Sequence, residues 1–194
     1  MINENFTYLA LLIGSIGGLS YLVATLQGKA KPNRVTWFLW ALAPFIAFSA
    51  QIQEGVGISA FFTFIAGFFP LLIFLASFLN KKSEWKMTKF DLICGALSLM
   101  GIFFWYLTKS GDIAIWFSLF ADGLAALPTI IKSYKDPESE DAKAYLLSAV
   151  AAGITLLTLR SYEFVYLGFP LYLFLLGTLL TIIIKFKIGK RVSL

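Results

Sequence analysis

The sequence predicts an all-α integral membrane protein whose seven transmembrane helices form two parallel three-helix repeats joined by a linker helix. Three observations predict it: an apolar composition, uncharged stretches of bilayer length, and basic residues concentrated on one side of those stretches. Of the 194 residues, 59% are hydrophobic and 14% are charged, against about 25% charged in an ordinary soluble domain. A water-soluble fold of this size could not bury so much apolar surface.

Seven apolar stretches approach the roughly 17 to 25 residues that a helix needs to cross a bilayer. They cover residues 6–26, 35–52, 55–79, 92–107, 113–131, 144–159 and 164–184. No positive charge precedes the first stretch, which is also too long for the apolar region of a signal peptide, so we expect it to be retained as a helix. The fourth and sixth are slightly short, and we expect the flanking Lys and Arg side chains to reach toward the headgroups.

The basic residues are distributed unevenly between the two sides of these spans. Lys109 and Arg160 lie on one side, and the other fourteen of the 16 Lys and Arg residues lie on the opposite side. Cytoplasmic loops carry such an excess of positive charge. We therefore predict a multi-pass protein of the cell membrane, with its N-terminus outside and its C-terminus in the cytoplasm. Attraction to anionic lipid accounts for the net charge of +5 without a nucleic-acid partner.

A faint internal repeat relates the two halves of the chain. Residues 14–29 align with residues 122–137 at a shift of 108 positions, with small residues mostly opposite small ones. If spans one to three match spans five to seven, the unpaired fourth span gives both triplets the same direction across the membrane. The chain then divides into three parts. These are a first bundle at 1–80, a cytoplasmic loop with the linker helix at 81–111, and a second bundle with a basic tail at 112–194.

The segment ALPTIIKSYKDPESEDAKAYLLSAV, residues 126–150, combines a helix, a proline, a basic loop and the start of the next helix. Together with the 3+1+3 arrangement, it resembles the SWEET and PQ-loop transporter superfamily, whose fold also includes the KDEL receptor. Thr129 stands where that family usually has glutamine. The resemblance implies a cavity between two three-helix bundles that opens alternately to either side. It also implies proline hinges, for which Pro128 and Pro44 are candidates; a static kink that shapes packing is the alternative.

Asp122 falls at the centre of the fifth span. An ionised carboxylate at bilayer depth costs about 2.5 to 3.5 kcal/mol on insertion scales, so something must compensate for it. One interpretation is a carboxylate that binds the substrate or a proton in a central cavity. The other is a carboxyl group that joins two helices through a hydrogen bond. Intramembrane ionisable residues are functional by default, and some proton-coupled members of the resembled family use acids in the fifth helix. We expect Asp122 to be the central site residue.

Other polar and aromatic residues within the spans are candidates for the same site. We predict that these are Trp40, Gln51, Thr129, Ser148 and Thr155. Each hydroxyl or amide could instead bond its own helix backbone. Trp37 lies three residues from Arg34 and is interpreted as an interfacial anchor, while the role of Trp40 stays open. The acidic cluster within residues 136–141 is interpreted as a solvated turn.

The absence of histidine removes most zinc and haem sites and all histidine-activated nucleophiles. We expect no enzyme activity, no cofactor and no metal site. The leading hypothesis is a small-solute transporter, for a sugar, an amino acid or a similar metabolite, either facilitative or coupled to protons. The alternative is a non-transporting receptor or structural membrane protein on the same scaffold. The expected partners are the solute, protons and the lipid bilayer, and either a monomer or a homo-oligomer could form the pathway.

Overall fold

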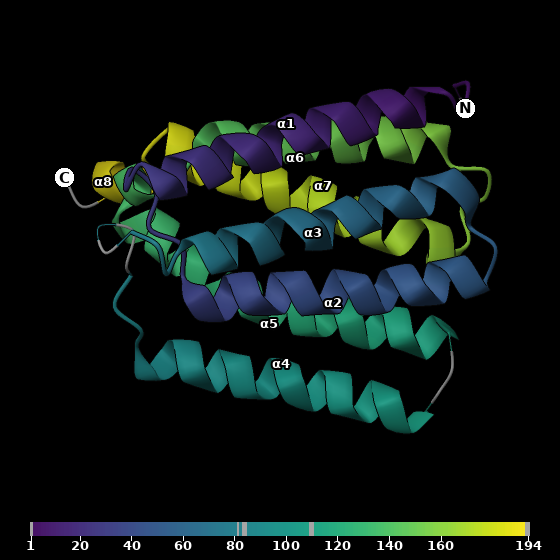
Figure 1. The fold of residues 1–194 in the computed structure, drawn as a ribbon, viewed down its shortest axis with the longest axis horizontal. Helices are drawn as coiled ribbons and strands as arrows, with labels where there is room; N and C mark the ends of the chain where they lie inside the picture. Colours follow the sequence, from purple (N-terminus) through teal and green to yellow (C-terminus); the bar gives the residue numbers. More distant parts are fainter. Residues whose placement is uncertain (1, 81, 83–84, 109–110, 193–194) are drawn as a thin grey trace.

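The structure, a computed structural model, describes residues 2–80, 82, 85–108 and 111–192. The described residues are predominantly helical and contain no strand. The long helices run side by side in one bundle (Figure 1). They are α1 (Phe6–Leu26), α2 (Arg34–Gln53), α3 (Ala60–Ala76), α4 (Lys89–Thr108), α5 (Gly111–Lys135), α6 (Ala142–Thr158) and α7 (Phe164–Lys185). A short helix, α8 (Ile188–Val192), follows α7.

Five helices of the described chain have the length and the hydropathy of membrane spans. They correspond to α1, α2, α3 with the preceding helical turn, Ile115–Lys135 of α5, and α7. The α6 helix is apolar but shorter. One face of α1 leaves large apolar side chains exposed, among them Leu12, Ile16, Leu19 and Val23. Such a surface is unfavourable in water and favourable against acyl chains, so these helices indicate a membrane-embedded protein.

Local sequence signals set three helix boundaries at one end of the bundle. The side-chain oxygen of Asn33 caps α2 by accepting from the backbone N–H groups of Val35 at 3.1 Å and Thr36 at 3.4 Å. Asp141 caps α6 in the same way, at 3.0 Å from the N–H two residues later. Just after α1, Gly28 adopts a φ of +73°, a left-handed conformation that glycine takes without strain. The α1–α2 and α5–α6 connections can therefore be tight.

Six helices form a closed ring of contacts, with α4 outside it. The α1 helix lies along α6 and α2 lies along α5, while α3 packs on both α1 and α2, and α7 on both α5 and α6. The α4 helix packs on α5 and to a smaller extent on α2, at the border of the bundle (Figure 1). The interior is consequently enclosed by six helices, and α4 does not contribute to it.

Glycines allow the close approach of several helices. A Cβ atom at Gly18 of α1 would overlap the ring of Phe69 on α3. One at Gly177 of α7 would lie 3.0 Å from the carbonyl oxygen of Tyr145 on α6. Small residues at such positions let backbones pack closely within a bilayer. These contacts hold α3 against α1 and α7 against α6.

One end of the bundle gathers the α1–α2 loop, the α5–α6 loop and α8 (Figure 1). We call it the basic end, formed by residues 27–33, 136–141 and 185–192; the far end carries the α2–α3 and α6–α7 loops. The Lys31 N–H donates to the Ser139 carbonyl at 3.0 Å, which joins the two loops. Hydrogen bonds from Lys187 and Lys190, at 2.9 and 3.0 Å, lower the pKa of Glu138 to about 2. The C-terminal helix is thereby tied to the α5–α6 loop.

Candidate functional site

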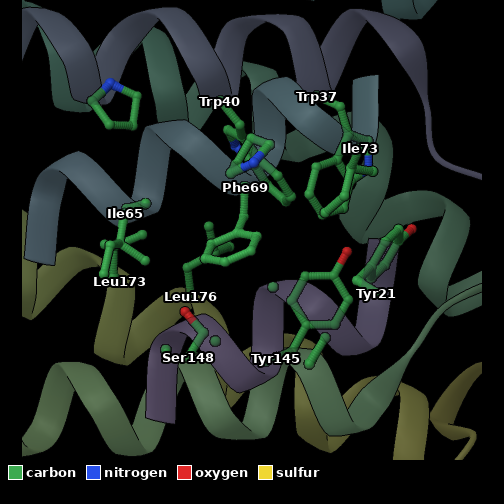
Figure 2. A pocket seen from close by; sticks show the side chains of 18 of the residues that line it. Tyr21, Trp37, Trp40, Ile65, Phe69, Ile73, Tyr145, Ser148, Leu173 and Leu176 are labelled. Carbon is green, nitrogen blue, oxygen red and sulfur yellow. The ribbon is translucent and has the colours of Figure 1, made fainter. Parts of the chain in front are cut away.

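A cavity lies inside the bundle, among residues of α1, α2, α3, α5, α6 and α7 (Figure 2). The space open to the centres of water molecules is about 110 Å³. Its walls are mostly aromatic and aliphatic side chains, together with glycine backbone from α1. A space of this size is large enough for several waters or one small solute.

Asp122 of α5 lines this cavity with only 2% of its surface exposed. Its Oδ1 atom has no hydrogen-bond partner among the described residues. The buried Tyr172 hydroxyl, on α7, interacts with the Asp122 carboxyl in an arrangement close to a hydrogen bond, although it falls outside standard hydrogen-bond geometry. No Lys or Arg is among the described residues that line the cavity. An ionised Asp122 would therefore present to this space a negative charge that no cationic side chain among the described lining residues balances.

Two side chains of α2 bind α5 beside Asp122. The indole Nε1–H of Trp40 donates to the Asp122 carbonyl at 3.3 Å. One turn earlier, the Thr36 hydroxyl donates to the Ala125 carbonyl at 2.8 Å. These bonds position the Trp40 ring in the cavity wall next to the acid, so Trp40 lines the predicted site.

Four aromatic rings contact one another in a closed circuit toward the basic end of the cavity (Figure 2). The ring centroids of Tyr21 and Trp37 are 4.3 Å apart, and those of Trp37 and Trp40 are 5.3 Å apart. The circuit closes through Tyr145, whose centroid lies 6.4 Å from that of Trp40 and 6.0 Å from that of Tyr21. We call these four side chains the aromatic wall. All four line the cavity.

The interpretation of Trp37 as an interfacial anchor is wrong. Its side chain is 4% exposed, packs on Tyr21 and lines the cavity. The neighbouring Arg34 reaches away toward the end of α3, where its guanidinium donates to Ser77 and lies over the Phe78 ring. The first turn of α2 is already inside the bundle, so a tryptophan near a cation does not mark the headgroup region here.

A buried ion pair lies behind the aromatic wall. The Lys132 Nζ atom is 2.6 Å from Glu140 Oε1, and the two side chains are 1% and 0% exposed. The other oxygen of Glu140 accepts hydrogen bonds from the hydroxyls of Tyr21 at 2.6 Å and Tyr145 at 2.9 Å. Lys132 also donates to backbone carbonyls in both loops of the basic end. Both charges are thus hydrogen-bonded by several groups, as burial requires.

The prediction of a solvated acidic turn within residues 136–141 is wrong for Glu140, which is 8% exposed. Its neighbour Asp141 caps α6 and also accepts from the Ser20 hydroxyl of α1 at 2.8 Å. Glu138 is the most exposed acid of this turn, with 60% of its side chain open to solvent, whereas Asp136 and Asp141 are partly buried. Composition alone suggests a turn, but the partners of these acids come from other helices.

Four of the predicted site residues meet at the cavity. They are Asp122, Trp40, Ser148 and the candidate hinge Pro44. Ser148, on α6, contributes a hydroxyl to a wall that is otherwise mainly apolar (Figure 2).

The other four predicted residues do not line the cavity. Thr155 is buried and donates to a carbonyl one turn earlier in its own helix, at 2.9 Å. Gln51 donates instead across the bundle, from α2 to the Val165 carbonyl of α7, at 3.2 Å. Thr129 is buried with its hydroxyl unpartnered among the described atoms. Pro128 lies inside α5, away from the cavity wall.

Sequence reasoning missed both tyrosines of the aromatic wall, as well as Tyr172. One signal was present, because Trp37 and Tyr145 are separated by the same 108 positions as the two aligned segments. An aromatic residue at both positions of an alignment suggests equivalent structural positions, and both side chains line the cavity. No comparable signal marks Tyr21 or the Lys132–Glu140 pair.

Comparison of the chain with protein-family models, with curated proteins and with solved structures finds no match in any of the three. Function is therefore inferred from the cavity and its chemistry.

Proposed function

We propose that this protein is a small-solute transporter of the cell membrane, and that its solute passes through the cavity lined by Asp122. One observation carries the proposal: a carboxylate that is 2% exposed, with an oxygen unpartnered among the described residues, borders an internal space. A charged group in hydrocarbon surroundings needs a compensating ligand. The space beside it provides room for one, either a proton or a solute.

We further propose seven spans in two parallel triplets, with the N-terminus outside. Helix packing supports this. If each helix of α1–α3 is exchanged with its counterpart in α5–α7, the contact between α1 and α6 becomes a contact between α5 and α2, and both contacts are present. Within each triplet, the third helix contacts both the first and the second. A two-fold relation between triplets would produce these pairings. They agree with the resemblance to the SWEET and PQ-loop superfamily, in which the solute path runs between two such bundles.

Alternating access would open the cavity first to one end and then to the other. At the basic end, the aromatic wall and the Lys132–Glu140 pair lie between the cavity and the loops. Opening there requires the pair to leave its contacts in at least one loop. Pro44, in the cavity wall, and Pro128, in α5, are the candidate hinges because each removes a backbone donor from its helix.

A non-transporting receptor or structural protein is the second candidate. Two observations favour it: the mostly apolar cavity walls, and the buried polar contacts that close the basic end. In that case Asp122 would bind a ligand or stabilise the bundle without net movement of solute.

Transport assays in proteoliposomes separate the two candidates. The purified chain is tested with radiolabelled sugars, amino acids and organic amines, with and without a pH gradient. We expect uptake of one class to fall by about tenfold or more in Asp122→Asn, because the variant cannot carry the charge on which binding depends. The matched control is Asp136→Asn, which changes an acid of the basic-end loop outside the cavity.

Full uptake by Asp122→Asn would contradict the assigned role of Asp122. Binding of a solute without any uptake would favour the receptor.

A further inference from the structure

We propose that the solute of this cavity is a small organic cation, whose ammonium group lies against Asp122 and whose apolar part packs on the aromatic wall. This inference rests on the proposed function, since it assigns a substrate class to the same site. Four properties of the cavity support it: its charge, its aromatic surface, its scarcity of hydrogen-bonding groups and its size.

The charge of the cavity selects the sign of the ligand. Asp122 is the only acid among the described lining residues, and no basic residue accompanies it there. The nearest buried cation on the same helix, Lys132, already binds Glu140 at 2.6 Å. A monovalent cation would neutralise Asp122, whereas an anion would be repelled from a space of low dielectric constant.

The aromatic wall favours an organic cation in particular. Ammonium groups are attracted to the faces of Trp, Tyr and Phe rings, with about 0.5 to 2 kcal/mol for each favourable contact. Trp40 brings such a ring to Asp122 itself, because its indole donates to the Asp122 carbonyl. Phe69 of α3 adds a further ring to the cavity (Figure 2). A carboxylate beside several rings is a suitable environment for an alkylated ammonium ion.

Few hydrogen-bonding groups of the wall are left for a sugar. The hydroxyls of Tyr21 and Tyr145 donate to Glu140, so these residues offer mainly ring surface to the cavity. The Trp40 N–H is also bonded, to the Asp122 backbone. The lining groups that remain for a solute are the Trp37 N–H, which has no partner among the described atoms, and the side chains of Ser148 and Asp122. A sugar would have to bury several hydroxyl groups without partners, and each unsatisfied group destabilises the complex.

The same scarcity disfavours a metal ion. Hard cations such as Ca²⁺ and Mg²⁺ take six or more oxygen ligands. Apart from the two tyrosines bonded to Glu140, the described lining side chains carry oxygen only on Asp122 and Ser148. An organic cation needs no such coordination shell, because its charge is spread over carbon-bound groups.

The size of the cavity limits the ligand to a few non-hydrogen atoms. Its volume of about 110 Å³ is below the roughly 300 to 1,000 Å³ of sites for drug-sized ligands. A compact amine or quaternary ammonium ion fits this range, and a peptide or an extended chain does not.

The test uses tetramethylammonium as the probe. Its permanent charge prevents leakage as a neutral base and removes proton binding by the probe as a complication. The full chain is reconstituted in lipid nanodiscs for binding, followed by tryptophan fluorescence, and in proteoliposomes for uptake of the radiolabelled ion. Glucose, sodium and acetate serve as competitors of other classes.

We expect saturable binding and uptake of tetramethylammonium, with no competition from the other three compounds. Asp122→Asn should weaken binding by about tenfold or more. Asp122→Glu should retain a measurable part of the binding, because glutamate keeps the negative charge. Trp40→Leu should weaken binding by about two- to thirtyfold, the equivalent of one ring contact. Asp136→Asn should bind as the unaltered protein does. Size-exclusion profiles verify that each variant is folded.

The outcomes distinguish this inference from the proposed function. Uptake of glucose or acetate without binding of the ammonium ion would overturn the inference and leave transport standing. Binding of tetramethylammonium that depends on Asp122, without uptake, would support the assigned chemistry and overturn transport. Binding that is equal in Asp122→Asn and the unaltered protein would overturn the inference.

Discussion

The two ends of the bundle each contain an ion pair with the same separation and a different environment. At the basic end, Lys132 and Glu140 are 2.6 Å apart and almost fully buried. At the far end, Arg160 and Glu4 are also 2.6 Å apart, but their side chains are 63% and 44% exposed. Removing one partner of a buried pair leaves a charge without solvent or counter-ion, whereas solvent replaces the lost partner of an exposed pair. Equal distances therefore do not imply equal contributions to stability.

Two buried hydrogen bonds among the described residues of the far end join neutral groups. Gln51 donates to the Val165 carbonyl at 3.2 Å, and the Thr7 hydroxyl donates to that of Thr158 at 3.1 Å. Breaking a neutral hydrogen bond lowers the free energy of unfolding by less than leaving a buried charge without its partner does. The far end should consequently tolerate substitutions better than the basic end.

The largest effect is expected from Lys132→Met. The substitution leaves the Glu140 carboxylate buried with only two tyrosine hydroxyls as partners, which should lower the free energy of unfolding by about 3 to 5 kcal/mol. Denaturant unfolding in detergent micelles measures it. The double variant Lys132→Met with Glu140→Gln should recover most of the loss, since no buried charge remains. A loss below about 1 kcal/mol in the single variant would contradict the buried state of the pair.

An intermediate effect is expected between the two ends, where packing acts without charge. Gly18→Ala introduces a methyl group that overlaps Phe69, and overpacking costs about 1 to 3 kcal/mol. Gly14→Ala is the matched control on the same helix, because its nearest neighbour would lie at an ordinary contact distance of 3.6 Å. Thermal unfolding of both variants should separate them clearly. Equal midpoints would show that α1 and α3 are less closely packed than described.

A smaller effect is expected from Gln51→Leu at the far end. It removes one hydrogen bond between α2 and α7, for a loss of about 0.5 to 1.5 kcal/mol. The same unfolding assay applies. If this loss matched that of Lys132→Met, the contrast between the two ends would be unfounded.

The smallest effect is expected from Glu4→Gln. The hydrogen bond from Arg160 lowers the pKa of Glu4 below its ordinary value of 4.5. The folded protein therefore binds this proton less readily than the unfolded chain, and the pair stabilises the fold above about pH 4.5. This contribution is lost as the pH falls through the lowered pKa. The unfolding midpoint of Glu4→Gln should match that of the unaltered protein in high salt, and should fall less steeply on acidification.

The helices could be predicted from the sequence because hydropathy is a local property. The first apolar stretch, 6–26, coincides with α1, and the last, 164–184, ends one residue before α7 does. Asp122 could be singled out for the same reason, as one acid inside an apolar run. Its position at a cavity follows the prediction, although its role stays a proposal.

Burial that depends on distant partners could not be predicted. Glu140 sits in a short polar turn, and its partner Tyr21 is 119 residues away in the chain. The buried Trp37 likewise packs on Tyr21, which belongs to another helix. Composition near each residue suggested solvent or headgroups, and tertiary packing overrode it. Thr155 shows the opposite case, where the local alternative, a bond to its own helix, is the one adopted.

The two tyrosines that share Glu140 have a mechanical consequence. Each ring lines the cavity while its hydroxyl donates a hydrogen bond to the Glu140 carboxylate, at 2.6 Å for Tyr21 and 2.9 Å for Tyr145. A ligand that displaces either ring must lengthen the hydrogen bond from that tyrosine to Glu140. Ligand binding in the cavity and movement of the loops therefore act on the same two hydrogen bonds, so the stability of the contacts at the basic end depends on what occupies the cavity.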